Sequence, residues 1–221
     1  SSAEARAEGG DRIANDAMSC EELTVFLRRS FAAVFDVCRA GACWYVAAPH
    51  GPIGLAFSIA LAELDVWKSS LVWVKDSLVM GRADYHCRHE PIYYGWKPGA
   101  GHHMLVARDQ TTVWEFARPK RSELHPTMKP IGLVARAINN STDAGDLVLD
   151  PYLGSGSTLI AAQRTNRCCF GCELMPKYAD VILKRAEDEG MSVELLETIA
   201  HAEPEAPKPK PAPKAKTKGK K

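Results

Sequence analysis

The sequence predicts a three-layer α/β fold built on one mostly parallel sheet. Short apolar strands alternate with amphipathic helices along the chain, which is the pattern of layered α/β domains. Residues 147–189 read as strand, helix, strand, helix, a unit that requires a parallel pair and a right-handed crossover. Of 221 residues 46% are hydrophobic, enough for one substantial core. We therefore expect one domain over 13–200, with linker or disordered segments at 1–12 and 201–221.

The first elements follow from capping and periodicity. Ser19, followed three residues later by Glu22, has the spacing of a capping box, and apolar residues then recur along one helical face. This pattern predicts a helix over 20–38, which Gly41 ends. The short apolar run 43–48 is rich in aromatic and β-branched residues and predicts a buried strand.

The middle of the chain is less regular. A turn at 50–52 leads into an apolar helix that we expect to end near Leu64. Residues 76–89 show few patterned positions and predict a loop. Apolar β-forming runs predict three strands around this loop and around His102 and His103, at 71–74, 91–96 and 111–116.

Order returns in the second half of the chain. Pro130 suits the first position of a helix that we expect to reach Asn140. The βαβα unit then comprises a strand at 147–150, a helix at 157–165, a strand at 168–172 and a helix at 176–189. The Pro/Ala/Lys segment beyond Glu197 lacks an apolar pattern, and we expect it to be extended and disordered.

Charge and cysteine content narrow the class of protein. The formal net charge is +1, yet residues 204–221 carry seven lysines and one glutamate, so +6 lies there and −5 on the rest. Binding of a polyanion therefore has to come from a local cleft or from this tail. The seven cysteines stand mostly in apolar runs and predict reduced core thiols in a cytoplasmic protein. The sequence contains no run of 18 apolar residues that could span a bilayer, so we do not expect a membrane as a partner.

The turn after the strand 147–150 indicates a ligand site. Asp150 ends that strand, and Gly154 and Gly156 let a ligand approach the backbone closely. Leu159 occupies the position at which the dinucleotide fingerprint G-x-G-x-x-G has its third glycine, and this disfavours a bound pyrophosphate. Glu173 follows Asp150 by 23 residues, the spacing at which an acid accepts hydrogen bonds from ribose. The pattern indicates a nucleoside without pyrophosphate; a tight turn with Glu173 on the surface is the alternative.

Two motifs carry a specific resemblance. Residues 150–158, DPYLGSGST, resemble the D-P-F-x-G-S-G-T-T motif of DNA methyltransferases that act on adenine N6 or cytosine N4. Residues 125–130, HPTMKP, resemble the H-P-T-x-K-P signature of the same bacterial and phage enzymes. The order of the two motifs is similar to the permuted, beta-class-like members, and 71–75 and 89–96 resemble later elements of their catalytic half. The resemblance spans about 13–189.

This resemblance implies the Rossmann-like sheet of class I methyltransferases, with S-adenosyl-L-methionine as cofactor and double-stranded DNA as partner. It also implies a site-specific enzyme of the restriction–modification kind, which methylates adenine or, less favoured, cytosine. The sulfonium cation of this cofactor tolerates a nearby carboxylate, which would repel a phosphate. The residues that the resemblance assigns to the cofactor are Asp150, Tyr152, Gly154, Gly156, Ser157, Glu173, Thr127 and Lys129.

One family element has no counterpart in the sequence. A [DNS]-P-P-[YFW] tetrapeptide normally accepts the hydrogens of the target amine and stacks on the flipped base. The 221 residues contain no such tetrapeptide, so the catalytic residue is unknown. Ile13 to Asp16 resembles the segment that follows it, and we expect a chain that starts just too late. A catalytically inert cofactor-fold module that binds DNA is the alternative, and an enzyme acting on RNA or a small molecule is a third reading.

Basic residues outside these motifs predict phosphate contacts, although each alone also fits an ordinary surface charge. The lysine tail predicts added non-specific attraction to DNA. Zinc is disfavoured, because the histidines near Cys87 and the pair Cys169 and Cys172 do not form two well-spaced ligand pairs. Oligomeric state stays open. The predicted DNA contacts are Arg82, Arg88, Arg118, Lys120 and Arg121.

Overall fold

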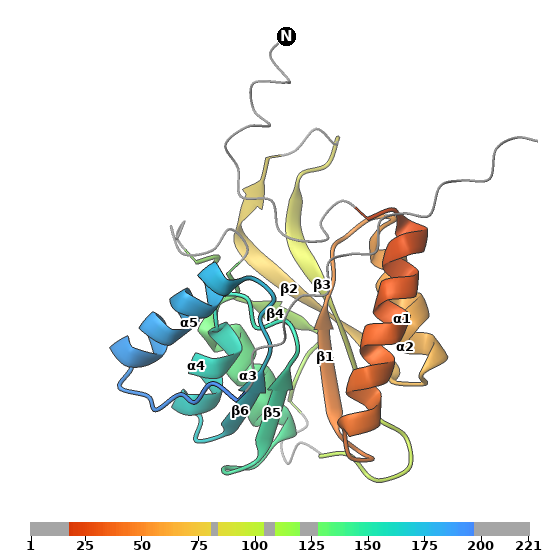
Figure 1. Ribbon diagram of the computed structural model, residues 1–221. Helices are drawn as coiled ribbons and strands as arrows, with labels where there is room; N and C mark the ends of the chain where they lie inside the picture. Colours follow the sequence, from red (N-terminus) through yellow and green to blue (C-terminus); the bar gives the residue numbers. More distant parts are fainter. Residues whose placement is uncertain (1–17, 81–83, 104–108, 120–127, 197–221) are drawn as a thin grey trace, which may run out of the picture.

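A computed structural model describes residues 18–80, 84–103, 109–119 and 128–196 of the chain. Its elements lie in three layers, with helices on both sides of strands (Figure 1). The helices are α1 (Cys20–Val37), α2 (Gly54–Glu63), α3 (Ile131–Ser141), α4 (Ser157–Arg164) and α5 (Pro176–Asp188). The strands are β1 (Cys43–Ala47), β2 (Trp67–Val79), β3 (Cys87–Trp96), β4 (Val113–Glu115), β5 (Leu147–Asp150) and β6 (Cys168–Gly171). The predicted α/β layers are confirmed.

The strands form two hydrogen-bonded groups. One has the order β1-β3-β2-β4, in which β3 runs antiparallel to both neighbours and β4 runs parallel to β2. The other is the parallel pair β5-β6, as the predicted βαβα unit requires. Parallel and antiparallel pairings are thus balanced in the described part of the chain. There β1 pairs only with β3 and β5 only with β6, and Leu147 and Leu149 on β5 are exposed.

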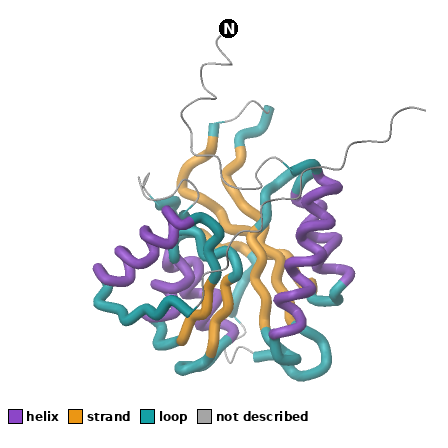
Figure 2. Tube along the Cα trace, viewed as in Figure 1, coloured by secondary structure: helices purple, strands orange, loops and turns teal. Residues whose placement is uncertain are grey.

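Two packed helix layers hold the strands (Figure 2). On one side Leu27 and Phe31 of α1 pack with α2 and with Trp44 of β1. On the other side Leu133 of α3 packs against a cluster that includes Trp114 of β4, while the far end of α3 packs on α4. The capping box predicted for α1 is present, since Ser19 Oγ accepts from Glu22 N at 3.2 Å and Glu22 accepts from Ser19 N at 2.9 Å.

The predicted loop at 76–89 is wrong at both ends, where residues 76–79 and 87–89 belong to strands. β2 runs on to Val79 and β3 already starts at Cys87, so the two strands form a ribbon that extends past the other strands (Figure 1). A register shift between the pairs Val74–His89 and Val79–Cys87 marks a bulge in it. The polar residues of the ribbon are largely exposed to solvent. A strand that is exposed on both faces does not alternate apolar and polar residues, so the sequence carries no strand pattern there.

The prediction of reduced core thiols is confirmed only in part. All seven cysteines are free, and Cys20, Cys38 and Cys169 are partly buried against hydrophobic clusters, whereas Cys168 and Cys172 are exposed. Cys168 begins β6 and Cys172 directly follows it, and among the described residues this strand pairs only with β5. The predicted tail and the residues before 18 lie outside the described residues.

Candidate functional site

The turn between β5 and α4 is closed by side-chain hydrogen bonds. Asp150 Oδ1 accepts from the backbone N–H of Tyr152 at 2.9 Å, and its Oδ2 accepts from Thr158 Oγ1 at 2.6 Å. Gly154 and Gly156 both have positive φ, at 57° and 80°, which only glycine adopts without strain. A Cβ on Gly156 would also lie 3.2 Å from Ile182. The turn is therefore fixed by the Asp150 carboxylate, and its Gly156 packs closely against α5.

Glu173 lies beside the same turn, as its spacing predicted. Its Oε2 accepts from Gly154 N and its Oε1 from Met175 N, both at 2.8 Å. The bond to Gly154 ties the chain after β6 to the glycine turn, the bond to Met175 is local, and Leu153 N donates to Cys172 O at 2.9 Å. Each carboxylate oxygen keeps a second lone pair, so Glu173 can still accept a hydroxyl from a ligand.

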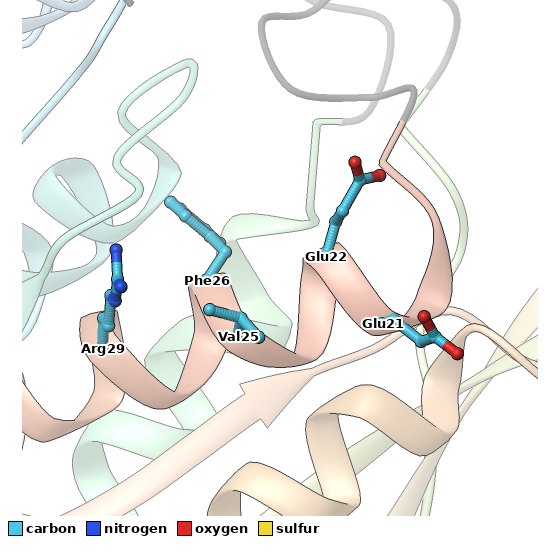
Figure 3. A pocket seen from close by; sticks show the side chains of 5 residues that line it. All are labelled: Glu21, Glu22, Val25, Phe26 and Arg29. Carbon is cyan, nitrogen blue, oxygen red and sulfur yellow. The ribbon is translucent and has the colours of Figure 1, made fainter. Parts of the chain in front are cut away.

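Tyr152 connects the turn to α1, a contact that the sequence did not predict. Its hydroxyl hydrogen-bonds Ser30 Oγ, 122 residues away, and its ring centroid lies 6.5 Å from that of Phe26. Partial burial raises the pKa of the Tyr152 hydroxyl. Phe26 lines a shallow hollow of about 440 Å³ on α1, and Figure 3 shows its ring directed toward the turn. The walls of this hollow are Glu21, Glu22, Val25, Phe26 and Arg29.

The segment before α3 also contacts the turn. Ser157 Oγ donates to the carbonyl oxygen of Lys129 at 3.0 Å, so these two predicted site residues do lie together. Lys129 also lines a second cleft, of about 290 Å³, between β1, β2, β3 and the chain before α3. Thr127, the other residue predicted here, lies outside the described residues. The cleft is lined by Ala47, Ala48, Pro49, Trp73, Lys75, Glu90, Arg118, Met128 and Lys129.

Two of the five predicted DNA contacts are described, and both lie near Lys75. Arg88 is exposed and its Nε donates to the Lys75 carbonyl at 2.9 Å. Arg118 is exposed at the cleft, and its backbone N–H donates to Asp76 Oδ1 at 2.7 Å. That bond holds the pKa of the Asp76 carboxyl below its usual range. The remaining three, Arg82, Lys120 and Arg121, lie outside the described residues.

Sequence reasoning missed the ion pair at the bottom of the cleft. Lys75 Nζ lies 2.6 Å from Glu90 Oε1, and Lys75 is only 7% exposed. The signal was present, because a lysine that directly follows the apolar run 71–74 has to be paired if it is buried. Within the described residues, no group of three or more histidine, cysteine or acidic side chains could hold a metal ion, and no helix is long and apolar enough to cross a membrane.

Comparison with known proteins gives a consistent set of relatives. The model of the DNA methylase family N6_N4_Mtase matches residues 7–184. The type II methyltransferase M.Cfr9I of Citrobacter freundii is 30% identical over 165 residues, which make up 66% of this chain and 53% of that enzyme. The chain spans about half or less of the length of the curated relatives that it matches.

Solved structures show the same fold. The M1.HpyAVI–SAM complex superposes with a TM-score of 0.61 at 22% identity, over 73% of this chain and 80% of that one. The cytosine-N4-specific PvuII DNA methyltransferase superposes with a TM-score of 0.63 at 16% identity, over 83% of this chain and 77% of that one. The fold predicted from the sequence is therefore confirmed as the Rossmann-like fold of these methyltransferases.

Proposed function

Because the chain belongs to the N6_N4_Mtase family of DNA methylases, we propose that it serves to methylate DNA with S-adenosylmethionine. The acceptor is the exocyclic amine of adenine (N6) or cytosine (N4), and adenine is favoured. The observation that carries the proposal is the turn of Asp150 to Thr158, with Glu173 hydrogen-bonded to it. When bound, the cofactor supplies an electrophilic methyl group on a sulfonium ion.

The residues at the turn fit this cofactor. Two carboxylates, Asp150 and Glu173, lie at a turn whose own residues include no basic side chain, and carboxylates suit a sulfonium cation and disfavour a phosphate. Arg185 of α5 donates to the carbonyl oxygen of Ser155 in this turn. Glu173 would accept hydrogen bonds from the ribose, and the half-exposed Tyr152 ring would cover one side. Gly154, Gly156 and Ser157 would line the backbone wall, with Thr127 and Lys129 at the methionine end.

Double-stranded DNA is the proposed partner. Arg118 and Lys129 stand at the cleft beside the turn, and Arg88 lies on the adjoining ribbon, where each could meet a phosphate. Arg82, Lys120, Arg121 and the lysines of 204–221 would add to the same attraction. We place the protein in the cytoplasm, where seven free thiols stay reduced.

A second candidate is a module that binds cofactor and DNA but transfers no methyl group. One observation favours it, namely that the 221 residues contain no two consecutive prolines and hence no [DNS]-P-P-[YFW] element. A flipped amine then lacks the acceptors that would aim its lone pair at the methyl carbon. Transfer of labelled methyl groups separates the two candidates, and cofactor binding is common to both.

Calorimetric titration with S-adenosylmethionine and S-adenosylhomocysteine tests the shared part. Gly154→Val forces a β-branched residue to φ 57°, and Glu173→Ala removes both the acceptor for ribose and the support of the turn. We expect each to weaken binding at least about tenfold, the loss of roughly one hydrogen bond to a charged group. Gly101→Ala is the matched control, because its added Cβ would meet open space at a position far from the turn in the sequence. Unchanged affinity in both folded turn variants would remove this cofactor site.

A further inference from the structure

β1 and β5 each have an open edge. Within the part of the chain that the structure describes, β5 pairs only with β6 and β1 pairs only with β3. The run 147–149 is apolar on both faces of β5, which is typical of a strand covered on both sides, yet Leu147 is 67% and Leu149 41% exposed. An apolar strand with an open edge is a template for pairing with a further strand.

The register of β5 shows which of its backbone groups are available. Cys168 N of β6 donates to Asp146 O at 3.0 Å, just before β5, and the ladder of the two parallel strands continues from there. The even-numbered residues of β5 therefore face β6. Because successive residues of a strand direct their backbone groups to opposite edges, the N–H and C=O groups of Leu147 and Leu149 point to the open edge.

The same reasoning applies to β1. Ala48 N donates to Pro91 O at 3.0 Å, so the even-numbered residues on this side of the ladder face β3. The backbone groups of Tyr45 and Ala47 consequently point to the open edge of β1. We refer to the backbone N–H groups of Leu147, Leu149, Tyr45 and Ala47 as the open-edge amides.

The two open edges belong to one layer, because helices on both sides bridge them. On one side Tyr45 of β1 hydrogen-bonds Ser141 of α3 at 2.8 Å, and Val148 of β5 packs on the cluster that α3 and α4 form. On the other side α1 packs on β1, and its Ser30 hydrogen-bonds the hydroxyl of Tyr152 just after β5. Figure 1 shows β5 on the side of the β5–β6 pair that is nearer to β1.

β1 and β5 also point the same way. Residues 47–49, at the end of β1, line the cleft to which Lys129 contributes. The carbonyl oxygen of Lys129 accepts from Ser157 Oγ, at the start of the helix that follows β5. The carboxyl ends of the two strands therefore lie at the same edge of the layer, and one strand between them can run parallel to both.

The order of elements along the chain identifies the segment that fits there. Crossovers between parallel strands are right-handed, and β5 leads through α4, on the α3 side, to β6. α1 lies on the opposite side of the strands and leads into β1. A right-handed crossover through the opposite side advances in the opposite direction. The strand that precedes α1 in the polypeptide therefore has its place between β5 and β1.

We propose that the position between β5 and β1 takes one extended apolar strand, which precedes α1 in the polypeptide and runs parallel to both neighbours. Ile13 is the only β-branched residue of 1–17, so the proposed strand comes from outside the 221 residues. It pairs through both of its edges, and its side chains stand beside Leu147 and Leu149. Its carboxyl end lies at the point where the strand order reverses, the place at which open α/β sheets bind ligands.

Addition of a peptide tests the proposal on the full 221-residue chain. The probe is a short peptide with a central run of valine and isoleucine and with lysines at both ends. In hydrogen exchange followed by NMR, we expect all four open-edge amides to exchange at least about tenfold more slowly when the peptide is bound, because each gains a hydrogen-bond partner. The amide of Val148 faces β6 and serves as the internal control. Absence of protection, or protection on β1 or β5 alone, would overturn the proposal.

Backbone methylation of the peptide distinguishes a strand between two neighbours from a strand at one edge. Between two neighbours, alternate amides of the peptide bond opposite strands. N-methylation of the odd-numbered or of the even-numbered amides should therefore each weaken binding at least about tenfold. A peptide that tolerates methylation of one set adds to a single edge and refutes the proposal.

Exchange of the chain without peptide tests the other occupants. We expect the open-edge amides to exchange faster than that of Val148 in the free chain. Slow exchange that is lost on dilution would assign the two edges to a second copy of the chain. Slow exchange that is lost when residues 1–17 are deleted would assign them to that segment. Either result would overturn the proposal, and neither bears on cofactor binding, which the titration of the turn variants measures separately.

Discussion

Removing the Glu173 carboxylate should destabilise the chain even without ligand. Glu173 accepts from Gly154 N and Met175 N at 2.8 Å each, and hydrogen bonds to charged groups contribute about 1.5–3 kcal/mol apiece. With a discount for its partial exposure, Glu173→Ala should lower the free energy of unfolding by about 3 kcal/mol. At about 2–4 °C per kcal/mol for a chain of this size, the melting temperature should fall by roughly 6–12 °C.

Two matched variants make this prediction sharp. Glu173→Gln retains one amide oxygen as an acceptor but turns an NH₂ group toward the second backbone donor, so we expect an intermediate loss. Glu187→Ala removes an exposed carboxylate on α5 and should change the melting temperature little. Thermal unfolding followed by circular dichroism measures all three. A Glu173→Ala variant that melts within about 2 °C of the parent chain would refute the role of this carboxylate in holding the turn.

Further predictions concern pH, packing and DNA. Burial raises the pKa of Tyr45 from 10.0 to about 12, so the folded state favours the protonated hydroxyl. The contribution of Tyr45 to stability should be complete below pH 10 and be lost between about pH 10 and 12. In urea unfolding at several pH values, Tyr45→Phe should make this loss shallower. A Cβ on Gly95 would lie 1.7 Å from the carbonyl oxygen of Val66, whereas a Cβ on Gly101 would meet open space. In denaturant unfolding, Gly95→Ala should therefore lower the free energy of unfolding by at least about 3 kcal/mol, and Gly101→Ala should change it little. Deleting 204–221 should weaken non-specific DNA binding and flatten its salt dependence by about 0.9 in logarithmic slope for each lost phosphate contact, and equal slopes would show that the tail is a bystander.

Local signals predicted the parts of the fold in which one face is buried. α1 was placed to within a residue, because its capping box and apolar stripe both act within the helix. The βαβα unit from β5 to α5 was correct because short apolar strands with a glycine turn between them have few other solutions. The strands at 71–74 and 91–96 were predicted, but the far end of the β2–β3 ribbon was missed, because its exposed residues are held by backbone pairing and leave no side-chain pattern.

The candidate site divides in the same way. Asp150 and Glu173 were predicted to belong to one ligand site, and both bond the same turn, because the carboxyl ends of neighbouring parallel strands share one edge of a sheet. The hydrogen bond between Tyr152 and Ser30 joins residues 122 positions apart, and no local sequence pattern at either residue predicts it. The pairing of Lys75 with Glu90 depends on the strand register, which a bulge shifts further along the same ribbon.

Methyl transfer is the most direct test of the account. The 221-residue chain and a form extended by a segment that carries the [DNS]-P-P-[YFW] element are incubated with duplex DNA and cofactor bearing a labelled methyl group. We predict that both bind the cofactor and that the extended form labels the N6 of adenine or the N4 of cytosine. The 221-residue chain should transfer at least about a hundredfold more slowly, since misplacing the amine by about 1 Å already costs that much. Equal rates for the two forms would contradict the account and require an acceptor for the amine within the 221 residues themselves.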